Sequence, residues 1–279
     1  MIGSEGLKGK IRNIANSKNL RSQEVLQMFF FERFLERLSK SKYKFNFVIK
    51  GGLLISSMIG IDNRTTMDMD TTIKGVPLKE EVIRNIISEI INVEVNDGIE
   101  FEITNISHIR EEDEYENFRV HLIANFDKIK NDIKIDITTG DAITPKEIEY
   151  LYPCMFQEES LRVLAYPLET ILAEKYESVI KRNITTTRMR DFYDLYNLYN
   201  LRKEEIDFDI LKQAIISTAN RRGSFSLMKQ AVEIIEDIKD DDYLKELWKV
   251  YLADNLYVGD LNFSETVKVV ELIEEKIAL

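Results

Sequence analysis

Two hydrophobic periods divide the first half of the chain into helices and strands. Apolar residues recur at helical spacing over Arg21–Lys40 and Lys79–Ile91, which predicts two amphipathic helices, and a short apolar helix follows at Leu53–Ile59. Residues 1–20 are polar, and we expect them to be loosely held. Alternating or β-branched runs predict strands at Tyr43–Ile49, Arg64–Ile73, Val93–Val95, Ile99–Ile106, Arg119–Phe126 and Ile133–Thr138.

The first predicted strand has a clear apolar face. Phe45, Phe47 and Ile49 alternate with polar residues, so all three would point to the same side of the sheet. The acidic run EEDEYE at residues 111–116 separates two later strands and reads as a solvated hairpin loop.

The strand signals stop near residue 150, where three of the four prolines gather. Beyond that point the spacing of apolar residues predicts helices only. We therefore expect an α+β chain with a domain boundary near residue 150, dividing it into residues 1–150 and 151–279. The predicted helices of the second part cover residues 167–181, 188–201, 209–220, 224–239, 241–254 and 263–277.

Composition narrows the class of protein. The chain has 279 residues, of which 44% are hydrophobic, enough for a sizeable core. No apolar run is long enough to cross a membrane, and the single cysteine, Cys154, cannot form an internal disulfide, so we expect a cytoplasmic protein. The net charge of −11 argues against a general nucleic-acid coat protein, so any polynucleotide would have to be held by a local basic patch.

A glycine pair precedes a short helix. Gly51 and Gly52 directly follow the first predicted strand. Without side chains they allow close approach of a polyphosphate, whose oxygens the backbone amides at a helix start can bind. The pair therefore predicts a nucleotide-binding turn.

Two aspartates lie on the next predicted strand with one residue between them. Residues i and i+2 of a strand point to one face, so Asp68 and Asp70 would present two carboxylates side by side while Met67 and Met69 face the core. Paired carboxylates suit Mg²⁺, which fills its remaining positions with water and phosphate oxygens. A lone DxD pattern is weak evidence, and the preceding glycine turn strengthens it.

A third carboxylate lies in the strand IKIDIT. Its neighbours Ile133, Ile135 and Ile137 share one face, and Asp136 points to the other. A carboxylate in the middle of such a strand needs a partner. One interpretation is a structural hydrogen bond. The one we favour is a third metal ligand, because three carboxylates on adjacent strands can hold two ions.

The helical half supplies two further candidates. Lys175 continues an otherwise apolar helical stripe, so it either extends its amine to the surface or neutralises a triphosphate. Asp191 and Asp194 share a helix face and would otherwise pair with Arg188 or Arg190, an alternative that is more serious for Asp194. From Lys175 to Arg190 basic residues outnumber acidic ones, so this stretch is a candidate strip for substrate phosphates.

Five motifs occur in an order that matches a known family. The sequence KGGLLISS, RTTMDMD, KIDITTGD, PLETILAEKYESVIKR and RMRDFYDLYNL resembles the AbiEii-type nucleotidyltransferase toxins, relatives of the MenT toxins, over about residues 45 to 200. The resemblance implies a DNA polymerase β-like nucleotidyltransferase lobe with a mixed sheet, followed by an all-helical lobe that closes over the nucleotide.

The resemblance also implies roles for individual residues. Asp68 and Asp70 would be the metal-binding pair, and Lys175 and Asp191 would be active-site residues of the helical lobe, with Lys175 binding the nucleotide. Gly52 stands where many nucleotidyltransferases have a serine, so a phosphate contact from that hydroxyl would be missing.

The family further implies a biological role. Its members belong to type IV toxin–antitoxin and phage abortive-infection systems, and relatives use an NTP to modify the tRNA 3′ end. We therefore expect Mg²⁺, with two ions, an NTP substrate, a tRNA acceptor and an antitoxin encoded alongside that forms no stable complex. Two alternatives stay open: transfer to a small-molecule antibiotic, which the acidic net charge slightly favours, and a nucleotide-binding module without catalysis.

Overall fold

The computed structural model describes residues 3–77, 79–109 and 117–279, and its contacts divide the chain into two compact units. The first unit contains residues 1–140 and 148–165, and the second contains residues 141–147 and 166–279. The predicted loop at 111–116 lies outside the described residues. No helix of the described chain is long and apolar enough to span a membrane.

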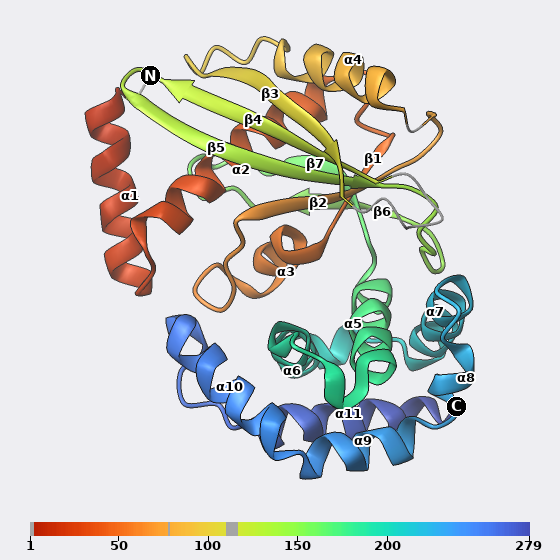
Figure 1. Cartoon of the computed structure of the whole chain (residues 1–279). Coiled ribbons are helices and arrows are strands. Elements are labelled where there is room, and N and C mark those ends of the chain that lie inside the picture. Colours follow the sequence, from red (N-terminus) through yellow and green to blue (C-terminus); the bar gives the residue numbers. More distant parts are fainter. Residues whose placement is uncertain (1–2, 78, 110–116) are drawn as a thin grey trace. The chain divides into compact units, whose positions relative to one another are not determined.

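A seven-stranded mixed sheet is the centre of the first unit (Figure 1). The strands are β1 (Phe47–Lys50), β2 (Asp68–Ile73), β3 (Glu100–His108), β4 (Phe118–Phe126), β5 (Ile129–Thr138), β6 (Ile148–Tyr152) and β7 (Leu161–Ala165). They lie in the order β3-β4-β5-β2-β1-β7-β6. The pairs β2–β5 and β1–β7 are parallel and the other neighbours are antiparallel, which confirms the predicted α+β class.

Four helices accompany this sheet: α1 (Ser4–Lys18), α2 (Ser22–Lys40), α3 (Gly51–Ile59) and α4 (Glu80–Ile91). Helix α2 packs against β5, β7 and α4, while α3 packs against β1 and β2. The isoleucines of β5 at 133, 135 and 137 are fully buried, as their alternation predicts. The opposite face of β5 is polar and carries Lys134 and Asp136.

The second unit is helical, as the sequence predicts. Its helices are α5 (Leu168–Arg182), α6 (Met189–Arg202), α7 (Phe208–Arg221), α8 (Phe225–Met228), α9 (Ala231–Asp240), α10 (Asp242–Asp254) and α11 (Phe263–Ile277). Helix α5 is the central element, because it packs against α6, α7, α8 and α9.

The N-terminal segment differs from the prediction of a loose tail. Residues 4–18 form α1, which packs on α2 and buries Leu7, Ile11 and Ala15. These residues are four positions apart, so they line one face of a helix. The polar residues between them are its solvent-exposed faces.

Two strand predictions are also corrected. Residues 93–95 form no strand, because the left-handed residues Asn96 (φ 53°) and Gly98 (φ 74°) turn the chain immediately afterwards. Beyond residue 150, where the pattern predicts helices only, β7 adds a parallel strand beside β1. Five residues with three adjacent apolar positions are too short to show a period.

Two side chains predicted to face the core are exposed. Strand β1 begins only at Phe47, and Phe45 lies in the preceding turn with 61% of its surface exposed. Met69 is buried as predicted, whereas Met67, just before β2, is 45% exposed. In both cases the alternating pattern begins in the sequence before the first residue of the strand.

A buried carboxylate fastens the loop after β6 to α2. Glu32 accepts hydrogen bonds from the backbone N–H groups of Met155 (2.7 Å) and Phe156 (3.3 Å). Burial raises the pKa of Glu32 to about 7 even though both hydrogen bonds favour its ionised form.

Candidate active site

The turn between β1 and α3 requires glycine at residue 51. Gly51 has φ +61°, a left-handed conformation that favours glycine. A Cβ atom added there would overlap the Asp70 carboxylate, lying only 2.7 Å from its Cγ. The backbone at the start of α3 therefore lies directly against the second aspartate of the DxD pair.

Gly52 is constrained by different neighbours. A Cβ atom there would lie 2.8 Å from Thr66 Oγ1 and 2.9 Å from Arg64 Nη2. Thr66 also hydrogen-bonds both the N–H (3.3 Å) and the C=O (2.9 Å) of Asp68. The space that a serine side chain would need at residue 52 is thus occupied by a hydroxyl and a buried guanidinium from the segment leading into β2.

A row of four charged residues crosses the sheet. In the strand register Lys50 of β1 is opposite Asp70 of β2, Asp70 is beside Asp136 of β5, and Asp136 is opposite Arg119 of β4. Directly paired residues point to the same face. The order of charges across the row is therefore positive, negative, negative, positive.

Asp136 is held by Arg119 through two hydrogen bonds. Arg119 Nε donates to Oδ1 at 2.7 Å and Nη2 donates to Oδ2 at 2.8 Å. The hydrogen bond with Asp136, together with the charges of Asp68 and Asp70, raises the pKa of Arg119 above its usual range. Sequence reasoning missed Arg119. Residues of β4 alternate between the buried core and the other face of the sheet, and Arg119 lies with His121 on that other face.

Lys50 supports the row from its other end. Its side chain is buried, and Nζ donates to Thr138 Oγ1 at 2.8 Å. Thr138 is in turn within 3.1 Å of the Thr72 hydroxyl. This lysine, adjacent to the glycine pair in sequence, was not singled out by the motif analysis.

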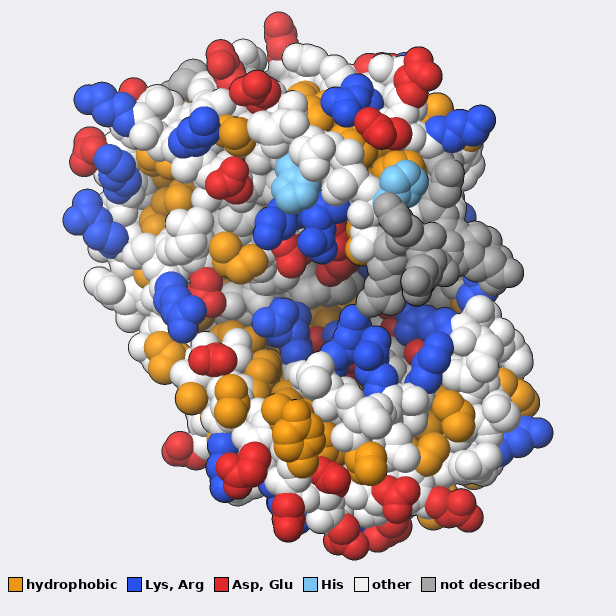
Figure 2. All heavy atoms as spheres, viewed as in Figure 1, with side chains coloured by type: hydrophobic (Ala, Val, Ile, Leu, Met, Phe, Trp, Pro, Cys, Tyr) orange, Lys and Arg blue, Asp and Glu red, His pale blue; other side chains and the backbone are white. Residues whose placement is uncertain are grey.

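Asp68 lies in a neighbouring row with basic groups. It is beside Lys134 of β5, which is opposite His121 of β4. Figure 2 shows the chain's two histidines on one face, with basic and acidic side chains close by. Within the described residues, no hydrogen bond or ion pair engages the Asp68 carboxylate, so it is available to a ligand.

Two of the three aspartates are suitably placed to bind a hard cation. Asp68 and Asp70 present carboxylate oxygens from one strand face beside a turn with no side chains, which is a suitable donor set for Mg²⁺ with water and phosphate. Across the described ranges, no three His, Cys, Asp or Glu residues are grouped as metal ligands. Asp136 as a third ligand therefore stays a prediction, and both of its oxygens are engaged by Arg119.

In the helical unit Lys175 and Asp191 come together as a buried cluster. Lys175 Nζ of α5 lies 2.7 Å from Asp191 Oδ1 and 2.8 Å from Asp194 Oδ2, both on α6. Ser178 donates to the other oxygen of Asp191 at 2.8 Å. Asp194, for which a surface pairing with Arg188 or Arg190 was the more serious alternative, is fully buried and belongs to the same cluster.

The cluster keeps its lysine charged. Burial lowers the pKa of Lys175, but the charges and hydrogen bonds of Asp191 and Asp194 outweigh it and raise the pKa above its usual value. The two acidic side chains share this one ammonium group. Arg188 and Arg190 at the start of α6 are exposed, so they remain candidates for contacts with a phosphate.

Comparison with known proteins identifies one family. The model of the family described as "Nucleotidyl transferase AbiEii toxin, Type IV TA system" matches residues 33–269. That range covers parts of both units and includes every candidate residue described above. No curated protein matches the chain.

Two crystal structures from Helicobacter pylori have a similar fold. One is of a candidate nucleotidyltransferase, with 16% identity, a TM-score of 0.55, and coverage of 93% of this chain and 98% of that one. The other is of JHP933, with 17% identity, a TM-score of 0.53, and coverage of 91% and 93%. At this level of identity the likeness concerns the fold alone.

Proposed function

Since the chain belongs to the AbiEii family, nucleotidyltransferase toxins of type IV toxin–antitoxin systems, we propose that it uses Mg²⁺ to transfer a nucleotide from an NTP to the 3′ end of tRNA. The observation that carries this proposal is the Asp68–Asp70 pair on β2, with the Gly51 backbone packed against Asp70. That arrangement combines a carboxylate pair with an open backbone turn, which is what a metal-bound triphosphate requires.

The proposed reaction is a substitution at the α-phosphorus. The 3′ hydroxyl oxygen of the acceptor forms a bond to the α-phosphorus, the bond from that phosphorus to the bridging oxygen breaks, and pyrophosphate leaves. The proton of the attacking hydroxyl passes to solvent. The chemistry supplied by bound Mg²⁺, with two ions expected, is activation of that hydroxyl and neutralisation of the leaving pyrophosphate.

In this proposal each residue of the sheet has a distinct task. Asp68 and Asp70 hold the metal, joined by Asp136 when Arg119 releases it. The turn at Gly51 and Gly52 packs closely against β2 and its preceding segment and offers backbone N–H groups to the triphosphate. Arg119 and Lys50 offset the repulsion among the carboxylates, because each provides a positive charge at one end of the row.

In the helical unit Lys175 and Asp191 are the proposed nucleotide-binding and positioning residues. The support is their buried ion pair, since a charged cluster of this kind costs desolvation free energy and adds little stability compared with apolar packing. Lys175→Met that folds normally and raises the KM for NTP would support the assignment. Unchanged kinetics in a folded Lys175→Met protein would contradict it.

The decisive experiment is label transfer. Purified protein is incubated with each α-³²P-labelled NTP, Mg²⁺ and total cellular RNA, beside Asp68→Asn protein as the matched control. We expect label in tRNA-sized RNA with wild type, and a loss of about 100-fold or more in the variant, because a neutral amide binds Mg²⁺ poorly. Full activity of Asp68→Asn would exclude the mechanism.

The biological part of the proposal is growth inhibition in the cytoplasm as a phage defence. It includes an antitoxin encoded alongside that opposes the modification without a stable complex with this chain. Expression of wild type, but not of Asp68→Asn, is expected to arrest growth. Co-purification of an equimolar antitoxin complex would contradict the second statement.

A second acceptor class is favoured by one observation. The net charge of −11 attracts cationic small molecules such as some antibiotics and repels polyanions. Drug resistance on expression, with label transferred to the drug and none to RNA, would select this alternative. NTP binding without transfer to either acceptor would indicate a nucleotide-binding module.

A further inference from the structure

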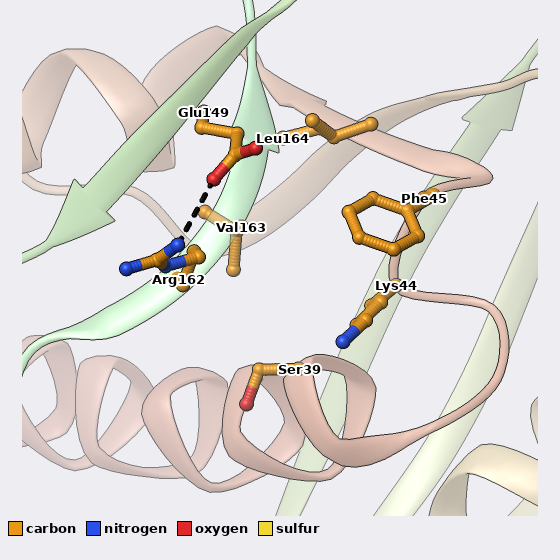
Figure 3. A pocket seen from close by; sticks show the side chains of 7 residues that line it. All are labelled: Ser39, Lys44, Phe45, Glu149, Arg162, Val163 and Leu164. Carbon is orange, nitrogen blue, oxygen red and sulfur yellow. Dashed lines mark hydrogen bonds and ion pairs between the residues drawn. The ribbon is translucent and has the colours of Figure 1, made fainter.

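An exposed aromatic ring lies at the edge of a small hollow in the first unit, away from the aspartates. Figure 3 shows this hollow with Phe45, Lys44 and Arg162 around it. Phe45 is 61% exposed. Leu151, which is opposite Arg162 in the register of β6 and β7, is 62% exposed. Exposed aromatic and arginine side chains are enriched in binding surfaces.

The cations beside the ring are available to a ligand. Lys44 Nζ lies 4.9 Å from the centroid of the Phe45 ring, and none of the ion pairs recorded for the described residues includes Lys44. Arg162, 74% exposed, has one contact of 3.3 Å with the exposed Glu149. An exposed pair of this kind is worth little, so an anion can replace Glu149 at low cost.

The turn that carries Phe45 is basic and aromatic throughout. Residues 40–45 read KSKYKF, in a chain whose net charge is −11. Lys42 lies 5.0 Å from the ring centroid of Tyr43, repeating the geometry of Lys44 and Phe45. Lys40 and Lys42 pair with the glutamates of α2 and α4 only at the surface, with 51% and 67% of their side chains exposed.

We propose that Lys44, Phe45 and Arg162, hereafter the KFR patch, bind a single-stranded segment of the RNA acceptor. Stacking of a base on an exposed aromatic ring combined with cationic contacts to the flanking phosphates is the usual mode of single-strand recognition. This inference rests on the proposed function, in which the acceptor is an RNA. It supplies the local basic patch that an acidic protein needs to hold a polyanion.

The position of the patch fits nucleotides away from the reacting end. Strand β1 starts two residues after Phe45 and ends at Lys50, opposite Asp70. Phe45 therefore lies beyond one end of β1, and Asp70 is paired with the residue at the other end. In this proposal the KFR patch contacts a different part of the acceptor from the 3′ hydroxyl at Asp68 and Asp70.

Oligonucleotide binding without NTP or Mg²⁺ tests the patch directly. The probe is a fluorescein-labelled single-stranded oligouridylate, measured by fluorescence anisotropy, with a blunt RNA duplex for comparison. The variants are Phe45→Ala, the conservative Phe45→Trp, and Lys44→Ala. The matched control is Tyr243→Ala, because Tyr243 is equally exposed at 60% but follows the acidic residues 240–242.

We expect Phe45→Ala to weaken binding about fivefold or more, because a base–aromatic stack contributes roughly 1–3 kcal/mol. Phe45→Trp retains binding, since indole also stacks. Lys44→Ala reduces the magnitude of the slope of log affinity against log salt by about 1, because one phosphate contact is lost. Because Phe45 is exposed, the folded state and the NTP affinity are expected to be unchanged in all variants.

Three outcomes would overturn the inference. They are unchanged binding in both Phe45→Ala and Lys44→Ala, an equal loss in Tyr243→Ala, and binding of an acidic peptide in place of the oligonucleotide. Failure of the proposed function is distinguishable from these outcomes. RNA binding that depends on Phe45, without label transfer, would support the KFR patch and contradict the proposed reaction. Label transfer that is unchanged in Phe45→Ala would support the reaction and contradict the patch.

Discussion

At the scale of single residues, the glycine pair and the DxD pair predicted a candidate site whose parts the structure brings together. The positively charged residues that surround this candidate site were not predicted. Gly51 and Asp70 meet in the structure because β1 and β2 pair with Lys50 opposite Asp70. Arg119 was not predicted, because a lone arginine in an alternating strand has no distinguishing pattern. Its role depends on a pairing between β4 and β5 that only the folded sheet creates.

Gly51→Ala tests the contact between the turn and the aspartate. The added methyl group needs a left-handed backbone and overlaps the Asp70 carboxylate. We expect loss of label transfer and destabilisation by about 1–3 kcal/mol, measured by urea unfolding. Gly9→Ala is the control, because nothing lies within 4 Å of a Cβ there. A fully active Gly51→Ala protein would contradict the assigned geometry.

Arg119→Gln tests the balance of charge in the row. Removing the guanidinium frees both oxygens of Asp136 and deletes a positive charge near Asp68 and Asp70. We expect Mn²⁺ affinity, measured by calorimetry without NTP, to rise about tenfold, which corresponds to roughly 1.4 kcal/mol. Arg84→Gln, which breaks an exposed helix pair, serves as the control. Weaker Mn²⁺ binding in Arg119→Gln would show that the arginine organises the site instead.

At the scale of elements, long periodic helices and the alternating strands were predictable, while short or polar elements were not. Helices α2 and α4 each show a full amphipathic stripe, so their hydrophobic period was readable. Helix α1 buries only one narrow face, and β7 has five residues. The conformation of such elements depends on the residues that they pack against, and those residues lie in other parts of the chain.

Glu32 predicts a pH-dependent attachment of one loop to α2. Its pKa is raised from 4.5 to about 7 in the folded protein, so the folded state binds more protons than the unfolded chain between those values. The contribution of this carboxyl is fully present below about pH 4.5 and is lost as the pH rises through about 7.

The matched variant Glu32→Gln lacks this titration. We expect the stability of wild type relative to Glu32→Gln to decline by up to about 3 kcal/mol between roughly pH 5 and pH 8. Urea unfolding of both proteins across that range, followed by circular dichroism, measures the difference. A stability difference that is constant with pH would contradict the raised pKa.

At the scale of the whole molecule, the order of motifs carried more information than composition. Net charge alone slightly favoured a cationic small molecule as the acceptor, whereas the motif order identified the nucleotidyltransferase family whose model matches residues 33–269. The aspartates on β2 and β5 are far apart in sequence and adjacent only through parallel pairing. Hydrophobic alternation identifies each strand but not the order of strands, so the row of charges could not be derived before the fold.

The salt dependence of RNA binding tests how an acidic protein holds a polyanion. A few local cations can contact only a few phosphates, so we expect the log affinity for RNA to fall with log salt with a slope between about −1 and −4. Filter binding at several potassium chloride concentrations measures it. A slope near zero would favour a neutral or cationic acceptor, and a much steeper one would require a larger basic surface than the described residues provide.

The position of β7 in the sheet has a consequence for the timing of toxicity during synthesis. Strand β1, which leads into the glycine turn, lies between β2 and β7. A ribosome has therefore translated the glycines and the two aspartates proposed to bind metal long before residues 161–165 are available to pair with the second edge of β1. An unfinished chain carries the proposed site residues on a sheet that still lacks β7. We expect incomplete translation products to be harmless to the cell that makes them, so the release of growth-inhibiting activity coincides with completion of the sheet.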